Sequence, residues 1–253
     1  MKRLLTALSI AVLGTLCASN SFAYQTFQGQ DANGNGTRVI SPINSTNAQV
    51  LFLGSGTPKI ETFEGQSPGP GPLTIAFGSG NTAVNATLSG ANGRVERATA
   101  PTDGRYSVPG GYQFWAATAS SGIGTFSITF DESVEAFGFF GIDIGDFGGT
   151  LSLELLDAKG DMMGTSYAVG TLTTGQDGSV LYFGIRAQNE NEWFRGIRFR
   201  PTNQTTAVDV FAFDSFTVVG APRTTPPGQI PEPATLALTG LALLAGSLVR
   251  RRA

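Results

Sequence analysis

Between residues 73 and 219 the sequence alternates apolar and polar residues in short runs, which glycine, asparagine, aspartate or serine separates from one another. In the runs 125–130 and 151–155, phenylalanine, isoleucine or leucine alternates with threonine, serine or glutamate. A period of two predicts strands that bury one face only, which is the usual state of strands in antiparallel sheets. This alternation restricts the chain to an all-β fold more strongly than any other feature of the sequence.

The runs predict ten strands and no convincing helix between them. We expect strands at 73–77, 84–88, 94–99, 112–118, 124–130, 134–142, 150–156, 180–186, 193–200 and 208–219. Residues 157–160 read Asp-Ala-Lys-Gly, which predicts a hairpin turn between two of them. Ten short strands in a chain with 34 glycines favour an antiparallel β-sandwich, jelly-roll-like in topology.

The remaining sequence divides into segments of different composition. We expect a signal peptide at 1–23, an N-terminal extension at 24–60, the β-sandwich domain at 61–220, a Pro-rich linker at 221–229 and a sorting or anchor segment at 230–253. The extension is expected to pack on the sandwich, with one helical turn or an edge strand at 44–53. Both chain ends are expected to be helical, one as a signal helix and one as a short transmembrane helix.

Composition excludes several classes of chemistry. The chain has no histidine, and its one cysteine, Cys17, lies in the leader, so Ser-His-Asp and Cys-His nucleophiles and His-ligated zinc are excluded. Of its 16 basic side chains five lie in the two ends, and of its 19 acidic side chains one does. The part between the ends therefore carries 11 basic and 18 acidic groups, a net charge of −7. That charge argues against nucleic acid as a partner, because binding to it depends on basic patches.

The N-terminus has the three parts of a secretory signal. Residues 1–3 include two basic side chains, residues 4–16 form a mostly apolar run, and residues 21–23 place serine and alanine where a signal peptidase reads small residues. Cleavage is expected between Ala23 and Tyr24. An N-terminal membrane anchor is the alternative, but a span needs about 20 apolar residues.

The C-terminus has the features of a second targeting segment. After the Pro-rich linker comes a proline-flanked glutamate, an uncharged run at 234–249 and a basic cluster. The residues that mark the two ends of this segment are Pro231, Glu232, Pro233, Arg250, Arg251 and Arg252. Sixteen helical residues rise about 24 Å, which spans a slightly thinned bilayer. The arginines are expected to stay cytoplasmic, which places the domain on the outer side of the inner membrane.

This tail resembles the PEP-CTERM sorting signal in motif, span length, basic cluster and terminal position. The resemblance covers about 24 of the 253 residues. It implies an exported protein of a bacterium with an outer membrane, sorted by an exosortase that is thought to cleave near the Pro-Glu-Pro motif. It also implies exopolysaccharide or biofilm matrix as the setting. Signal peptidase and exosortase are the processing partners that follow from the two ends.

Two segments of the middle region resemble those of the sandwich domains that accompany such tails. They are Phe137–Asp143 and Phe211–Val218. Those domains resemble lectin-like and carbohydrate-binding jelly rolls. In such jelly rolls an acidic residue of the first strand and one of the last can share a structural calcium ion. Here Glu64 and Asp214 are the residues in those places, with Asp209 nearby, and the alternative is that they face solvent or cap turns.

Another calcium candidate comes from spacing. Asp31, Asn33 and Asn35 place oxygen side chains at positions 1, 3 and 5 of a loop, with glycine at position 6. Position 12 is Pro42 instead of the bidentate glutamate of an EF-hand, so an EF-hand is excluded and a solvated Asn-Gly turn is the alternative. No other cofactor is expected.

Further candidate residues each have a structural alternative. Asp143 and Asp146 could act as a glycosidase pair, although they share one loop, which favours a polar turn. Aromatic side chains could stack on sugar rings, or they could belong to the core. Arginines could bind an acidic polysaccharide, or they could lie on a solvated face. These residues are Tyr112, Trp115, Tyr182, Trp193, Arg195, Arg198 and Arg200.

Three functions follow from these features. The first is a non-catalytic component of the cell surface or of the exopolysaccharide matrix, delivered by the tail. The second is a carbohydrate-binding module of the biofilm matrix. The third is a glycan hydrolase that uses carboxylates alone, which ranks last because paired acids are scarce and no catalytic residue is predicted.

Overall fold

The computed structural model describes residues 23–32, 37–54, 57–101, 103–108, 110–119, 124–144, 150–170, 178–202 and 209–220. The expected signal peptide up to residue 22, the linker, the sorting motif and the arginine cluster lie outside these ranges. Within the described part, no helix combines the length and apolarity that crossing a bilayer requires. The expected transmembrane helix at 234–249 falls among the residues that are not described.

Thirteen strands, one α-helix and two short 3-10 helices make up the described chain. The strands are β1 (Gln25–Asp31), β2 (Lys59–Glu61), β3 (Gly69–Pro70), β4 (Leu73–Phe77), β5 (Val84–Gly90), β6 (Arg94–Arg97), β7 (Gln113–Ala119), β8 (Phe126–Ile142), β9 (Thr150–Leu156), β10 (Met162–Val169), β11 (Val180–Arg186), β12 (Phe194–Thr202) and β13 (Asp209–Gly220). The helices are η1 (Gly80–Thr82), α1 (Ile43–Leu53) and η2 (Glu190–Glu192).

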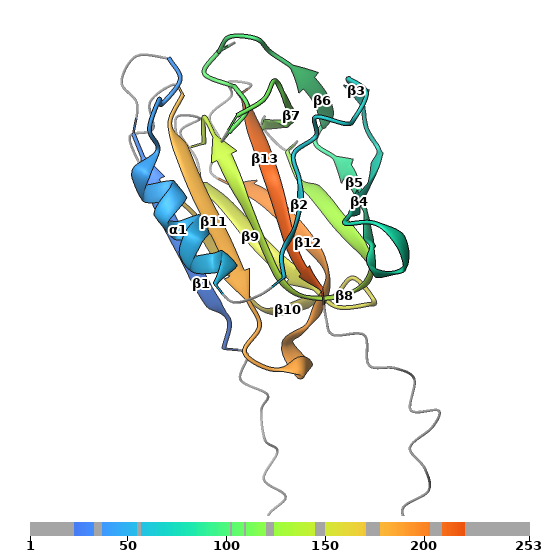
Figure 1. Cartoon of the computed structure of the whole chain (residues 1–253). Coiled ribbons are helices and arrows are strands. Elements are labelled where there is room, and N and C mark those ends of the chain that lie inside the picture. Colours follow the sequence, from blue (N-terminus) through green and yellow to red (C-terminus); the bar gives the residue numbers. More distant parts are fainter. Residues whose placement is uncertain are drawn as a thin grey trace, which may run out of the picture.

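Strand β8 organises the fold because its two halves belong to different layers. Residues 126–130 of β8 pair with β5 on one side and with β12 on the other, which gives a layer ordered β4-β5-β8-β12-β9-β10. Residues 136–142 pair with β11 and β13, which gives a second layer ordered β1-β11-β8-β13-β7-β6-β3. We call these layer 1 and layer 2. Every pair is antiparallel, so the predicted antiparallel β-sandwich is confirmed (Figure 1).

The core between the layers is built largely from phenylalanine. Phe126 and Phe199 of layer 1 stack with ring centroids 4.2 Å apart. Phe213 of layer 2 lies 4.9 Å from Phe126 and 5.3 Å from Phe199, and both contacts cross the interface. Because aromatic pairs in such tilted and stacked arrangements add to the free energy of burial, these rings fix how the two layers sit on each other.

The outer face of layer 2 is covered by helix α1, which lies along β1 and β11 (Figure 1). The helix buries Ser45, Ala48 and Phe52. A Cβ atom on Gly184 of β11 would stand 2.5 Å from the Phe52 ring, so glycine is required for this close approach. The buried Tyr106 and Val108 join the same apolar cluster on this face. Layer 2 is thus closed on both sides.

The structure corrects the expectation for residues 24–60. Strand β1 pairs with β11 along its whole length and α1 covers the sheet, so the stretch is part of the sandwich and the boundary expected at residue 61 is too late. The helical turn or edge strand expected at 44–53 is an eleven-residue helix. Its sequence is rich in asparagine, serine and threonine, which have low helix propensity, so packing and not propensity stabilises it.

Other differences concern single strands. The strands expected at 124–130 and 134–142 are one continuous strand, β8, because both halves keep pairing partners through the bend. Four strands are absent from the expected set: β1 in the N-terminal stretch, β2 and β3, which are very short, and β10, which is mostly exposed and lacks alternation. Elsewhere the predicted and observed strands agree within a few residues, and β4, β9 and β11 agree at both ends.

Candidate functional site

The outer face of layer 1 is the open sheet face of the sandwich. Outward residues of β5 and β8 are hydroxyl-bearing: Thr87 pairs with Thr129, and Ser89 pairs with Ser127. Both side chains on β8 are at least partly exposed, and their inward neighbours are buried. Among the described residues, no helix and no second apolar cluster covers this face, whereas the outer face of layer 2 has both. It therefore offers a broad polar surface on a rigid scaffold.

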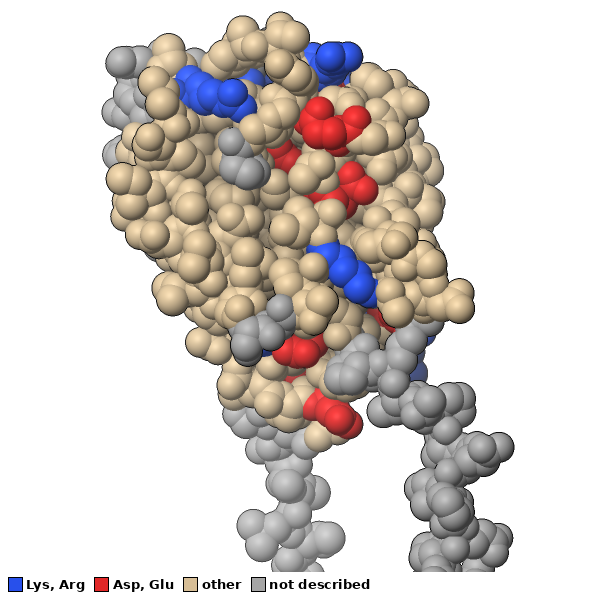
Figure 2. Space-filling model, in the orientation of Figure 1, with Lys and Arg blue, Asp and Glu red and all other residues tan. Residues whose placement is uncertain are grey.

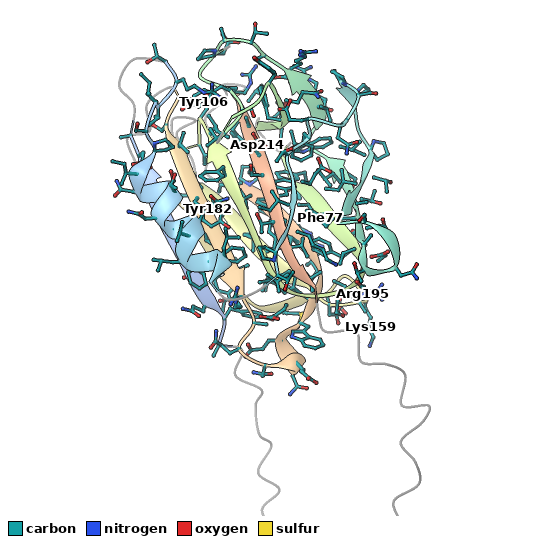
Figure 3. The ribbon with its side chains drawn as sticks, viewed as in Figure 1. Phe77, Tyr106, Lys159, Tyr182, Arg195 and Asp214 are labelled. Atoms are coloured by element: carbon teal, nitrogen blue, oxygen red, sulfur yellow. The ribbon has the colours of Figure 1, made fainter. Side chains whose placement is uncertain are left out.

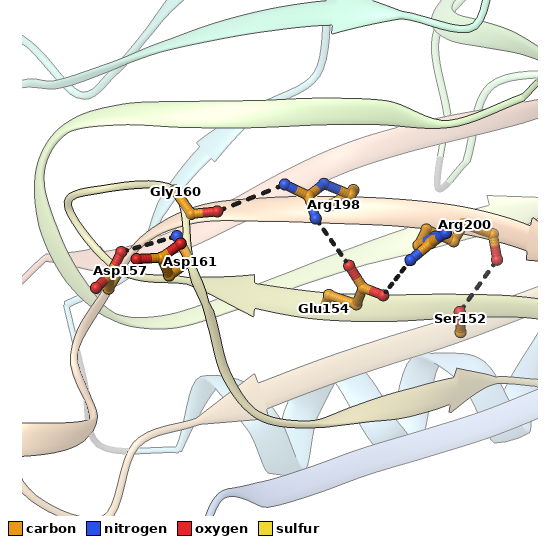
Figure 4. A network of polar contacts seen from close by, with 7 residues as sticks. All are labelled: Ser152, Glu154, Asp157, Gly160, Asp161, Arg198 and Arg200. Carbon is orange, nitrogen blue, oxygen red and sulfur yellow. Dashed lines mark hydrogen bonds and ion pairs between the residues drawn. The ribbon is translucent and has the colours of Figure 1, made fainter.

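On β12 and β9 the same face of layer 1 carries charged side chains. Glu154, whose side chain is 8% exposed, accepts hydrogen bonds from Arg198 and Arg200, each with an N–O distance of 3.1 Å (Figure 4). Arg198 pairs with Ser127 in register, and Arg200 pairs with Ser152. The prediction that Arg198 and Arg200 belong to a partly solvated face agrees with their side-chain exposures of 34% and 53%.

A groove lies at one end of this face, where glycine interrupts a row of side chains. Gly196 of β12 pairs with Thr129 on one side and with Leu156 on the other, so it forms a low point between them. The groove has a volume of about 350 Å³, in the range of small-ligand sites. It is lined by Thr129, Phe130, Leu156, Asp157, Ala158, Lys159, Gly160, Arg195 and Gly196. We call it the Gly196 groove.

The β9–β10 turn forms one wall of this groove and is held in place by its own hydrogen bonds. Oδ1 of Asp157 accepts from the backbone N–H groups of Lys159, at 2.8 Å, and Asp161, at 2.9 Å. These two bonds hold the pKa of the Asp157 carboxyl below its usual range. Arg198 also reaches the carbonyl of Gly160, which ties the turn to β12 (Figure 4). The predicted turn at 157–160 is confirmed.

A second polar cluster surrounds the carboxyl group of Asp214, which is fully buried in a bulge of β13. Its Oδ2 accepts from the Ser107 hydroxyl at 2.7 Å and from the Val108 N–H at 2.8 Å, while its Oδ1 accepts from the Ser215 N–H. Burial raises the pKa of Asp214 well above its usual range, and the charge of Glu64 raises it further. The structure thus brings together the two acids that the sequence singled out.

Glu64 approaches this cluster from the exposed side. Its Oε1 accepts from the backbone N–H groups of Tyr112 and Gln113, both at 2.7 Å. A Cβ atom on Gly111 would stand 2.2 Å from that oxygen and 3.2 Å from the Ser107 hydroxyl, so both oxygens lie beside the same glycine. Within the described ranges no three Asp, Glu or Cys side chains gather as a metal site would require. Any cation here would need backbone and hydroxyl oxygens as well.

Asp31 has a different role from the one the loop spacing suggested. Its Oδ1 accepts from the backbone N–H of Asn44 at 3.0 Å, and its Oδ2 accepts from the N–H and the hydroxyl of Ser45 at 2.8 and 2.6 Å. These groups belong to the first turn of α1, so Asp31 caps the helix from β1. Asn33 and Asn35 lie outside the described residues.

The aromatic candidates separate by burial. Trp115 is fully buried and Tyr182 is 1% exposed, so the interpretation of Trp115 as a ligand-binding residue is wrong: its ring has no free face. Glycines surround Trp115, since a Cβ atom on Gly93 would stand 2.2 Å from its ring. Tyr112 is 49% exposed, and the Arg97 guanidinium lies 5.6 Å from its ring centroid. Trp193 is partly exposed.

The remaining candidates are placed as follows. Asp143 is 4% exposed and accepts from the Gly178 N–H at 2.9 Å, which fits the polar turn, while Asp146 lies outside the described residues. The Asp209 backbone belongs to β13. At the expected processing point, the Ala23 N–H donates to Glu192 and the Tyr24 hydroxyl donates to the Glu192 carbonyl.

Figure 3 shows how far apart the two polar regions lie: Lys159 and Arg195 are at one end of the sandwich, and Asp214 and Tyr106 are toward the other. On the side of the molecule that carries α1, charged side chains lie singly or in small groups, and neither sign forms a broad patch (Figure 2). Sequence reasoning missed the Gly196 groove and the hydroxyl rows of β5 and β8. The polar positions of the alternating runs already indicate a row of hydroxyl groups on one face of these strands.

Residues 229–253 match the family described as the PEP-CTERM protein-sorting motif. The chain therefore carries this sorting motif, which confirms the resemblance of the tail and implies an exported protein that an exosortase processes and sorts to the cell surface. No curated protein matches the chain.

Solved structures that align with part of the chain include adhesin and carbohydrate-binding domains. The K2 cleaved adhesin domain of Lys-gingipain aligns with a TM-score of 0.41 and 12% identity, over 65% of this chain and 99% of that one. TmCBM61 in complex with β-1,4-galactotriose aligns with a TM-score of 0.28 and 14% identity, over 54% and 88%. The enzymatically active domain of the bacteriophage CBA120 tailspike protein 4 aligns with a TM-score of 0.31 and 15% identity, over 54% and 19%. At these TM-scores the likeness carries no argument about function.

Proposed function

We propose that this chain, which carries an exosortase sorting motif, is a non-catalytic protein of the cell surface or exopolysaccharide matrix whose sandwich binds a polysaccharide. The observation that carries the proposal is the contrast between the two sheet faces. The outer face of layer 2 is covered by α1 over β1 and β11 and by the buried Tyr106 and Val108, while layer 1 presents hydroxyls, arginines and one carboxylate on its sheet. Hydroxyl and guanidinium groups on such a sheet match the dense, regularly spaced hydroxyls of a polysaccharide better than they match an apolar protein partner.

Sorting is part of the same proposal. The chain would enter the inner membrane with its arginine cluster inside, lose its leader to signal peptidase between Ala23 and Tyr24, and be released by cleavage near Pro231. Mass spectrometry of the native protein tests both steps. An N-terminus at Tyr24 and a C-terminus near Pro231 are expected, whereas a chain intact through Ala253 would mean permanent anchoring.

Binding through the face of layer 1 is tested with the mature protein and purified matrix polysaccharide. Ser127→Tyr places a large side chain in the middle of the face, and Val50→Tyr is the matched control on the exposed side of α1, where Val50 is 60% exposed. Ser127→Tyr is expected to abolish retention on the immobilised polysaccharide, and Val50→Tyr is expected to leave it unchanged. Equal retention of both variants would contradict the proposal, and so would cleavage of the polysaccharide by the protein.

A structural calcium ion at Glu64 and Asp214 is a further part of the proposal. The two carboxylates lie beside the Ser107 hydroxyl and, through its hydrogen bond of 2.6 Å, beside the Gly110 carbonyl, so oxygen atoms of the kind that Ca²⁺ prefers converge there. A divalent cation would offset the burial that raises the pKa of Asp214 and would keep both acids charged. These residues would hold the ion and tie Ser107 and Val108 to β13.

A further inference from the structure

The Gly196 groove differs from the rest of the layer 1 face in how its guanidinium group is paired. Arg195 contributes a guanidinium whose contact in the structure is with the backbone carbonyl of Asp131, which uses one of its five N–H donors. Farther along β12, Arg198 and Arg200 share one carboxylate, that of Glu154, so each of these two guanidinium groups is ion-paired although the three groups together keep a net charge of +1. The groove is therefore the place on this face where a guanidinium is not paired with a carboxylate within the described chain.

Lys159 adds a second cation to the lining of the groove. It stands in the β9–β10 turn, is exposed, and lines the same groove as Arg195 (Figure 3). The one carboxylate in the lining is Asp157, and its Oδ1 is directed at the backbone N–H groups of its own turn. Two cations against one carboxylate thus leave the groove with a net positive charge of one.

The shape of the groove favours a ring over a simple ion. Leu156 and the glycine at 196 give it a low, partly apolar floor, and Thr129 provides a hydroxyl at its edge. A pyranose ring has C–H groups for such a floor, and its hydroxyls match the serine and threonine rows that continue along β5 and β8. The protein carries a net charge of −7 between its ends, whereas the groove and the adjoining cluster of Arg198, Glu154 and Arg200 are each net positive, so an acidic polymer would be attracted to this part of the face.

We propose that the Gly196 groove binds the carboxylate of a uronic acid residue in an acidic polysaccharide, with Arg195 as a bidentate donor and Lys159 as a second cation. The inference rests on the proposed function, and it adds the substrate class and the two residues that select it. A guanidinium presents two parallel N–H groups that match a carboxylate, and such charge-assisted hydrogen bonds are roughly twice as strong as neutral ones.

The test compares two polymers that differ only in charge, polygalacturonate and its carboxyl-reduced form, on the mature protein. Arg195→Gln together with Lys159→Gln is expected to weaken binding of polygalacturonate by about tenfold or more, the effect of losing one or two hydrogen bonds to a charged group. Binding of the carboxyl-reduced polymer is expected to be weaker in the unchanged protein and unaffected by the substitutions. Arg97→Gln, an exposed arginine on β6 in layer 2, is the matched control and is expected to change neither.

The outcomes separate this inference from the proposed function. If both polymers bind equally and the double variant binds as well as the unchanged protein, the inference is overturned while the polysaccharide-binding face stands. If neither polymer nor the matrix polysaccharide binds, both are overturned. Competition distinguishes the sources of the anion: free galacturonate should displace the polymer, and displacement by inorganic phosphate at equal concentration would assign the groove to phosphate and contradict the inference. Unchanged melting temperatures exclude misfolding of the variants.

Discussion

Replacing Asp31 with alanine removes the cap of helix α1. Three hydrogen bonds are lost, two from the backbone N–H groups of Asn44 and Ser45 and one from the Ser45 hydroxyl, which is fully buried. Loss of a helix cap costs about 0.5–2 kcal/mol, and the upper end applies here because a charged acceptor also faces the helix dipole. We expect a loss of about 2 kcal/mol, or roughly 4–8 °C in melting temperature for a domain of this size.

Thermal unfolding followed by circular dichroism measures this loss, and hydrogen exchange of residues 43–53 locates it. Asp161→Ala is the matched control, since the contact recorded for Asp161 in the turn is made by its backbone. A loss below about 0.5 kcal/mol would refute the capping role, because that is the smallest effect expected for a cap. A loss that occurs only when calcium is present would instead restore the loop interpretation of Asp31.

Three further predictions concern single sites. Burial alone would raise the pKa of Glu192, but in the unprocessed chain the backbone N–H groups of Ala23 and Gln188 donate to it and hold the pKa below its usual range. The ionised Glu192 therefore stabilises the folded protein fully above the usual glutamate pKa, and this stabilisation is lost as the pH falls through the pKa of Glu192 in the folded state. In urea unfolding, Glu192→Gln should destabilise the protein at pH 7 and not at pH 3. Gly184→Ala should displace Phe52 and lower the unfolding free energy by about 1–3 kcal/mol, as overpacking does. Millimolar calcium should raise the melting temperature, and Glu64→Gln with Asp214→Asn should abolish the rise; no rise in the unchanged protein would contradict the calcium proposal.

Alternation in the sequence predicted β5 and residues 126–130 of β8, which bury one face in the shared core, whereas β11 and residues 136–142 of β8 are buried on both faces and form nearly continuous apolar runs. It did not predict that residues 126–142 form one strand, since the bend between its halves depends on partners distant in sequence. The full length of helix α1 could not be predicted for a similar reason. Its stability comes from the Asp31 cap and from the packing of Phe52 against Gly184, and both are tertiary contacts.

The candidate site was predicted in part. The proximity of Glu64 and Asp214 followed from a resemblance, and the partly solvated position of Arg198 and Arg200 followed from their spacing. For Trp115 the sequence left ligand binding and the core as alternatives, and burial decides for the core, because alternation alone does not say which face of a strand is buried in a sandwich. The Gly196 groove depends on the register of three strands, and register is set by the pairing of the whole sheet and not by local sequence.

The central claim, that the outer face of layer 1 binds polysaccharide, is tested most directly by hydrogen exchange of the mature protein with and without the matrix polysaccharide. Added polysaccharide should slow exchange in β5, β12 and residues 126–130 of β8, and should leave α1 and β11 unchanged. Slower exchange confined to α1 and β11, or no change in any strand at saturating polysaccharide, would contradict the account.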